Sequence, residues 1–182
     1  MRLFIAVNFS DEIKSRILKV QGQLRSQTFK GNFTRPENLH LTLAFLGETP
    51  EARLEDLFHI MEKIQTRPFD ILFNQTGCFS SGGKELWWIG ADRNSEGLSL
   101  LKAIHGQLLK GLEVNAFPVD KKPFNAHITL GREIKHSGPI ILNKPEIQVP
   151  VDCISVMKSE HLRGVLTYTK LTTREFQVRE LR

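Results

Sequence analysis

One strand-like segment of this chain carries a histidine and a threonine on the same face. Residues 38–45 read NLHLTLAF, and successive side chains of a strand alternate between its two faces. His40 and Thr42 therefore share one face. The apolar residues share the other: Leu39, Leu41, Leu43 and Phe45. A lone histidine in such a segment is more often a satisfied core residue than a functional one, so its interpretation depends on a counterpart elsewhere in the chain.

Residues 124–132, FNAHITLGR, supply that counterpart with His127 and Thr129 on one face. The two histidines are 127 − 40 = 87 residues apart, about half of the 182-residue chain. Each follows a predicted helix start at a similar distance, 40 − 10 = 30 residues after Ser10 and 127 − 95 = 32 residues after Ser95. This weak repeat predicts two related halves, approximately 1–84 and 85–182, packed about a pseudo-two-fold axis. The two His-Thr faces would then meet at one cleft.

The remaining patterns predict alternating strands and helices with no low-complexity linker, and hence one compact bilobal domain over residues 1–182. Apolar stripes at helical spacing, with capping residues or an early proline, predict helices over 10–24, 50–64 and 95–110. The sequence SSGGK, residues 80–84, predicts the turn of a hairpin. Strands are expected over 3–9, 33–35, 39–46, 69–79, 85–91, 124–132, 146–159 and 165–176, the last two joined by a loop over 160–164.

Composition and charge favour a soluble protein with an anionic partner. The chain is 40% hydrophobic and 25% charged, with a net charge of +5. That excess favours RNA or a phosphorylated small molecule over a membrane surface, although many soluble proteins carry such a charge without a polyanion partner. Cys78 and Cys153 are isolated, as in reduced cytoplasmic proteins, and the apolar run 3–7 is too short for a signal peptide or a membrane span. We expect a cytoplasmic monomer without membrane contact.

Two imidazoles facing one cleft suit paired acid–base catalysis at phosphorus. A neutral imidazole can take a proton from water while a protonated one delivers a proton to the leaving oxygen, and an ordinary pKa of about 6.5 permits either role. Each threonine hydroxyl lies about 6.6 Å further along the same strand face, where it can donate to a phosphate oxygen. Such a pair can open a strained cyclic phosphodiester without a metal. No spaced His or Cys cluster predicts a metal site beside them.

The segments PENLHLTLAFLG and FNAHITLGR together resemble the two-histidine phosphoesterase superfamily, whose signature is a pair of His-x-Thr/Ser-x motifs. They are most similar to its RNA 2′,3′-cyclic phosphodiesterase branch, also called the 2′-5′ RNA ligase family, and the resemblance extends along the whole chain. It implies an α+β fold, with two mainly antiparallel sheets lining a central cleft and helices outside. It also implies cofactor-free hydrolysis of 2′,3′-cyclic phosphate ends to 2′-phosphates, with weak reversal that joins RNA ends through a 2′-5′ bond.

The resemblance assigns a role to each motif residue. His40 corresponds to the proton donor to the leaving 3′ oxygen and His127 to the base that activates water, an assignment that the chemistry of the residues alone leaves open. Thr42 and Thr129 correspond to the hydroxyls that bind the phosphate.

The resemblance also gives Arg132 a contact to the phosphate or the base. Strict alternation places Arg132 on the opposite face from His127, so that contact requires the strand to break at Gly131. Ala126 stands where the family often has proline, a difference expected to affect how the chain enters the strand and not the chemistry.

The other polar and aromatic candidates have ordinary structural interpretations. Trp87 and Trp88 point to opposite faces of one strand, so that one is expected in the core and the other could stack on a base. Four histidines are expected outside the site, the first solvated, the second packed and the last two in loops: His59, His105, His136 and His161. A basic group around the second motif could form a rim for an RNA end or a solvated edge: Lys121, Lys122, Arg132, Lys135, Lys158 and Arg163.

Two other functions fit the same residues. A module that binds RNA ends could keep the pocket and perform no chemistry. A cyclic phosphodiesterase could act on a small nucleotide, such as a cyclic phosphate derived from ADP-ribose. Measurement of product formation separates the first from an RNA enzyme, and a panel of cyclic phosphates separates the second.

Overall fold

The computed structural model describes residues 1–120 and 122–177, and within these ranges the chain forms three α-helices and nine β-strands. The helices are α1 (Asp11–Ser26), α2 (Leu54–Glu62) and α3 (Glu96–Val114). The strands are β1 (Arg2–Asn8), β2 (Lys30–Phe33), β3 (His40–Glu48), β4 (Phe69–Ser81), β5 (Lys84–Ala91), β6 (His127–Lys135), β7 (Ile147–Val151), β8 (Cys153–Leu162) and β9 (Val165–Glu175). The described strand pairs are all antiparallel, and the predicted α+β class is confirmed.

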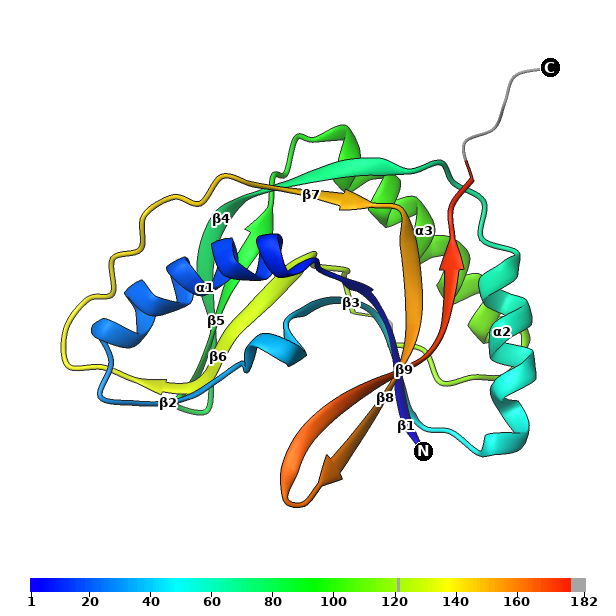
Figure 1. The fold of residues 1–182 in the computed structure, drawn as a ribbon, viewed down its shortest axis with the longest axis horizontal. Helices are drawn as coiled ribbons and strands as arrows, with labels where there is room; N and C mark the ends of the chain where they lie inside the picture. The colour runs from blue at the N-terminus through cyan, green and yellow to red at the C-terminus, as the bar shows by residue number, and fades with distance from the viewer. Residues whose placement is uncertain (121, 178–182) are drawn as a thin grey trace.

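The strands form two lobes that share one hydrogen-bonded sheet (Figure 1). The first lobe contains β3, β1, β8 and β9, and the second contains β7, β4, β5 and β6, with β2 also paired to β6. The two predicted sheets are joined where Leu41 of β3 lies opposite Ile128 of β6. The strand that carries His40 is therefore the direct neighbour of the strand that carries His127.

The two sequence halves exchange strands between the lobes. β4 comes from the first half but pairs with β5 in the second lobe, and β8 and β9 come from the second half but complete the first lobe beside β1. The predicted boundary near residue 84 consequently falls inside the β4–β5 hairpin. That hairpin turns as predicted through Gly82 and Gly83, whose φ angles of 57° and 72° favour glycine.

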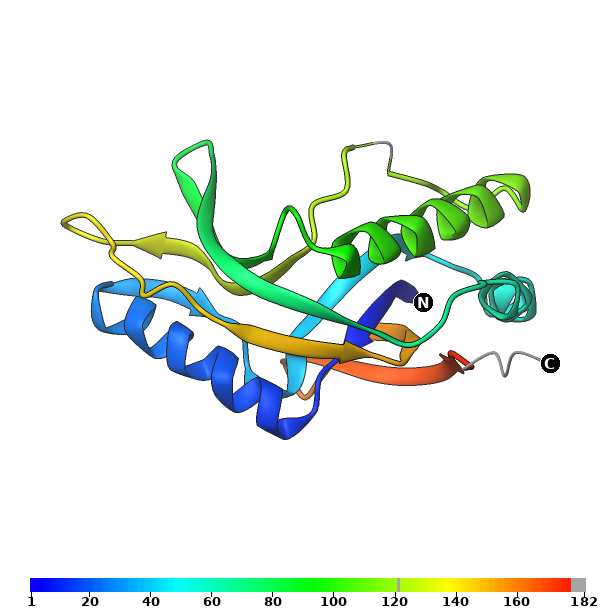
Figure 2. The same ribbon diagram turned by 90° about the horizontal axis from the view of Figure 1, so that it is seen from above.

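The helices flank the sheet and bury their apolar stripes against it (Figure 2). The hydroxyl of Ser10 accepts from the amide of Ile13 at the start of α1, and that of Ser95 accepts from Leu98 at the start of α3. α1 packs against β6 and β7, whereas α3 packs against β4 and β3. Each motif strand therefore packs against one of these helices.

Several predicted boundaries were wrong for identifiable reasons. The predicted strand 146–159 divides at Asp152 because β7 pairs with β4 and β8 pairs with β1. The predicted loop 160–164 is a tight turn at Arg163 and Gly164, both with positive φ, so that His161 lies in β8 and not in a loop. The second helix begins with a 3-10 turn over 51–53, α3 continues to Val114, and residues 124–126 precede β6 without joining it.

Candidate active site

The two His-x-Thr motifs lie side by side on one face of the sheet. Because Leu41 and Ile128 are opposed in an antiparallel pair, continuing the register by one residue places His40 beside Thr129 and Thr42 beside His127. All four side chains are half-buried, whereas Leu41 and Ile128 between them are buried in the core. The structure thus brings together all four of the motif residues that the sequence predicts.

In each motif strand one extra residue breaks the alternation of faces. The residue five positions after the histidine therefore reaches the histidine face. In β6, Thr129 pairs with Trp88 and Gly131 pairs with Trp87, so that Leu130 is an extra residue and Leu130 and Gly131 are both buried. The alternation therefore resumes one residue later, and the positive charge of Arg132 acts on both motif imidazoles. This irregularity is the strand break at Gly131 that the predicted contact between Arg132 and the phosphate or base requires.

The equivalent break in β3 overturns one sequence prediction. Ala6 pairs with Thr42 and Ile5 pairs with Ala44, which leaves Leu43 as the extra residue. Phe45 was predicted to share the core face of Leu43, but it is 59% exposed. Its ring lies 6.4 Å from Phe4, the ring that also contacts His40. Phe45 and Arg132 thus follow their histidines by the same five residues and reach the histidine face for the same reason.

The ring of His40 is held by hydrogen bonds on both nitrogens. Its Nδ1–H donates to the carbonyl of Asn38 at 2.7 Å, and its Nε2 lies 2.9 Å from the hydroxyl of Thr42. The rings of Phe4 and Tyr168 pack on it at centroid distances of 4.9 and 5.2 Å. The orientation of His40 is therefore fixed by groups from three strands and the turn that precedes β3.

His127 has the same anchor and a more open surrounding. Its Nδ1–H donates to the carbonyl of Asn125 at 2.8 Å, and the ring of Phe79 meets it edge-on at 5.3 Å. Since a carbonyl can only accept, both histidines carry a proton on Nδ1, and in the neutral form Nε2 keeps its lone pair. Nε2 of neutral His127 can therefore accept a proton.

Burial lowers the pKa of both motif histidines below the usual imidazole value. For His40 the hydrogen bond to Asn38 opposes this effect, while the charges of Arg132 and His127 lower its pKa further. For His127 the hydrogen bond to Asn125 opposes burial, and the charge of Arg132 adds to it. The charge of His127 thus acts on His40, and the charge of Arg132 acts on both imidazoles.

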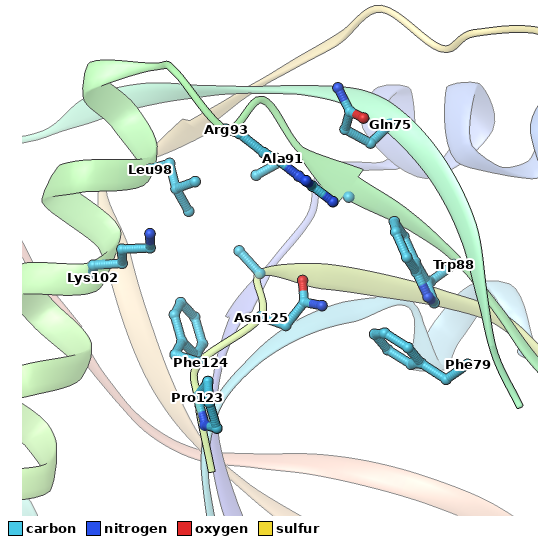
Figure 3. A pocket seen from close by; sticks show the side chains of 12 residues that line it. Gln75, Phe79, Trp88, Ala91, Arg93, Leu98, Lys102, Pro123, Phe124 and Asn125 are labelled. Carbon is cyan, nitrogen blue, oxygen red and sulfur yellow. The ribbon is translucent and has the colours of Figure 1, made fainter. Parts of the chain in front are cut away.

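A cavity of about 460 Å³ adjoins the motif face, between α3, the β4–β5 hairpin and the segment before β6 (Figure 3). Phe79, Asn125 and Ala126 line it. The ring of Phe79 contacts that of His127, and Asn125 and Ala126 directly precede His127 in the chain. Trp88 also lines the cavity, whereas Trp87 packs against the core and donates from Nε1 to Glu85. The two tryptophans therefore occupy opposite faces of β5, as predicted.

The remaining histidines lie outside the motif face. His59 is exposed, as predicted, and His105 is packed, stacking on Phe124 at 4.2 Å and bonding the carbonyl of Leu43. His136 follows β6, and its hydrogen bond to the carbonyl of Gly138 raises its pKa, an effect to which its ion pair with Glu85 adds.

The predicted basic group is not a single cluster of free charges. Lys158 is paired with Glu160 at 2.7 Å, Arg163 lies at the tip of the β8–β9 hairpin, and Lys121 lies outside the described residues. The rim for an RNA end stays a prediction.

Over residues 1–120 and 122–177, no three His, Cys, Asp or Glu side chains are grouped as a metal site would require. None of the helices in these ranges is long and apolar enough to cross a bilayer.

Sequence reasoning missed the groups that orient the imidazoles and the walls around them. The signal for the anchors was present, because both motifs read Asn-x-His-x-Thr. The aromatic walls had no such signal, because Phe4, Tyr168 and Phe79 come from strands remote in sequence from the motifs.

Comparisons with known proteins agree with this fold and identify the family of the chain. The family described as LigT like Phosphoesterase matches residues 7–87. RNA 2′,3′-cyclic phosphodiesterases of Archaeoglobus fulgidus and Thermus thermophilus are 34% and 33% identical, over 76% and 88% of this chain and 76% and 82% of their own. The solved protein TT0787 of Thermus thermophilus has a TM-score of 0.81 and 29% identity over 99% of this chain and all of its own. The chain therefore belongs to the LigT-like phosphoesterase family.

Proposed function

We propose that this protein hydrolyses RNA 2′,3′-cyclic phosphate ends to 2′-phosphomonoesters without a metal ion. One observation carries the proposal: two imidazoles on adjacent strands share one face, and each donates from Nδ1 to a backbone carbonyl. Both Nε2 atoms can then exchange protons with one phosphate group. The relatives named RNA 2′,3′-cyclic phosphodiesterase support this choice of substrate.

The reaction begins with His127 neutral and His40 protonated. Nε2 of His127 removes a proton from water as the water oxygen bonds to phosphorus, and Nε2–H of His40 gives its proton to O3′ as the P–O3′ bond breaks. The products are a 2′-phosphomonoester and a free 3′-hydroxyl. The two histidines end in exchanged protonation states and return by proton exchange with solvent.

The neighbouring donors stabilise the charge on the phosphate. Thr42 and Thr129 donate from their hydroxyls to the non-bridging oxygens, and Arg132 supplies positive charge on the same face. In the free protein the hydroxyl of Thr42 lies 2.9 Å from Nε2 of His40, so binding of the substrate redirects this hydroxyl from the imidazole to the phosphate. Residues 1–182 act as one bilobal unit in this scheme, because each lobe contributes one histidine.

The decisive experiment incubates the purified protein, in excess EDTA, with an RNA oligonucleotide that ends in a 2′,3′-cyclic phosphate. We expect complete opening to a 2′-phosphate, identified by its resistance to an enzyme that removes only 3′-phosphates. The variant His59→Ala, altered at an exposed histidine, serves as a matched control and should keep full activity. Tight, salt-sensitive binding without conversion would instead establish a binding module, and loss of turnover in EDTA would contradict the metal-free scheme.

A panel of small cyclic phosphates, including one derived from ADP-ribose, tests the substrate class. The RNA end should have the highest kcat/KM. Weak joining of ends through a 2′-5′ bond, in which a 5′-hydroxyl replaces water as the nucleophile that bonds to phosphorus as the P–O3′ bond breaks, should require both motif histidines as well.

A further inference from the structure

The cavity beside His127 has one aromatic side and one cationic side. Figure 3 shows Trp88 and Phe79 on one side and Lys102 of α3 on the other, with Asn125 between them. Arg93, in the turn between β5 and α3, extends into the same space. A volume of about 460 Å³ lies within the usual range for sites that bind small molecules.

Two glycines make room for the indole of Trp88 to lie flat against the sheet. A Cβ atom at Gly77 would come within 2.4 Å of the indole, and one at Gly90 within 2.7 Å. Gly77 is the cross-strand partner of Trp88, and Gly90 lies two residues further along β5. With this face of the indole packed on glycine, the other faces the cavity and provides a stacking surface beside Phe79, whose ring lies 5.2 Å away.

The cations of the cavity have no partners within the described residues. Arg93 and Lys102 both have exposed side chains, and neither forms an ion pair or a side-chain hydrogen bond with residues 1–120 or 122–177. The described lining residues include no carboxylate. Two unpaired positive charges beside an aromatic surface are suited to an anion attached to a planar ring.

We propose that this cavity binds the nucleoside whose cyclic phosphate lies at the motif histidines, with its base on Trp88 and its 5′ phosphate at Arg93 and Lys102. The proposal rests on the proposed function. Phe79, Asn125 and Ala126 connect the cavity to His127, so a nucleoside with its 2′,3′ edge at His127 extends into the cavity. Its 5′ oxygen is on the opposite side of the ribose, which directs the 5′ phosphate away from the imidazoles. In RNA this phosphate is the link to the preceding nucleotide, so the preferred substrates are RNA ends and not isolated nucleoside cyclic phosphates.

Binding of two products tests the proposal without requiring turnover. Calorimetry compares a nucleoside 2′,5′-bisphosphate with the corresponding 2′-monophosphate. We expect the wild-type protein to bind the bisphosphate about tenfold or more tightly, with a preference that decreases as salt is added. The variant R93Q/K102Q should lose this preference and keep its affinity for the monophosphate.

The variant K63Q/K110Q removes two exposed charges outside the cavity and should keep the preference. Trp88→Leu should weaken both ligands alike, by about tenfold, whereas Trp88→Phe should retain most of the affinity. Equal affinity of the wild-type protein for the two ligands, or an unchanged preference in R93Q/K102Q, would overturn the proposal. Because binding is measured separately from hydrolysis, absence of ring opening would refute the proposed function but would not change the comparison of the two affinities.

Discussion

The side-chain amide of Asn38 donates a hydrogen bond to the carbonyl of Leu166, 2.9 Å away. This bond connects the turn before β3 to the β8–β9 hairpin, 128 residues further along the chain. The backbone carbonyl of the same asparagine accepts the proton on Nδ1 of His40. The position of the hairpin and the orientation of the first imidazole are therefore coupled through one buried residue.

Asn38→Ala should lower both stability and turnover. Removal of the amide leaves the Leu166 carbonyl without this donor, at a cost of about 1–3 kcal/mol in the free energy of unfolding. The carbonyl that orients His40 is then less fixed, and kcat should fall by about tenfold or more. Chemical denaturation and steady-state kinetics measure the two effects. The matched control is Asn143→Ala, an exposed asparagine outside both motifs and outside the cavity beside His127; an equal loss of kcat in both variants would refute the coupling.

The pH dependence of kcat/KM should be bell-shaped with its maximum below about pH 6.5. Activity rises as His127 loses its proton and falls as His40 loses its proton. Burial lowers the pKa of both groups, so both limbs move to lower pH than for two unperturbed imidazoles, and the apparent values belong to the coupled pair. The profile of kcat should lie at higher pH, because a bound phosphate anion favours the protonated imidazoles. A maximum of kcat/KM at alkaline pH would be inconsistent with these shifts.

Arg132→Gln should move both limbs of that profile to higher pH. The positive charge of Arg132 lowers the pKa of His40 and of His127, so its removal lets both values rise. If Arg132 also binds the phosphate, kcat/KM should fall by about tenfold or more at the new optimum. Lys135→Gln, on the same strand, is the control and should leave both limbs in place. Unchanged limbs in Arg132→Gln would show that this charge does not act on the histidines.

Two glycines of α3 should respond to alanine in opposite directions. A Cβ atom at Gly97 would lie 2.1 Å from the carbonyl oxygen of Asp70, part of the backbone of β4, so Gly97→Ala should destabilise the protein by about 1–3 kcal/mol. At Gly106 the space is open, and an alanine in a helix interior should stabilise by about 0.5–1 kcal/mol. Thermal unfolding of the two variants checks the signs, and destabilisation by Gly106→Ala would contradict the packing of α3.

The sequence was sufficient to predict the elements and the four motif residues because their signals are local. Alternation along residues 39–43 and 126–130 identified the His-Thr faces, and the serine caps identified the starts of α1 and α3. The repeated spacing also predicted that the two faces meet, and the pairing of Leu41 with Ile128 is the contact that brings them together.

Features that depend on pairing between distant strands could not be predicted. The extra residues Leu43 and Leu130 are defined only by the strands opposite them, β1 and β5, so Phe45 was assigned to the wrong face. The placement of β4 in the second lobe and of β8 in the first likewise leaves no local pattern in the sequence. The two asparagines of the motifs look equivalent in the sequence, but of these two only the side chain of Asn38 has a hydrogen-bond partner among residues 1–120 and 122–177.

A double-mutant cycle on His40 and His127 tests the central claim most directly. The kcat/KM for an RNA with a 2′,3′-cyclic phosphate end is measured for His40→Asn, His127→Asn and the double variant, with folding checked by circular dichroism. If both imidazoles act on one phosphate in one step, each single variant should lose about 100-fold or more. The double variant should then be little worse than the poorer single variant. Wild-type activity in either single variant, or losses that multiply in the double variant, would contradict the account.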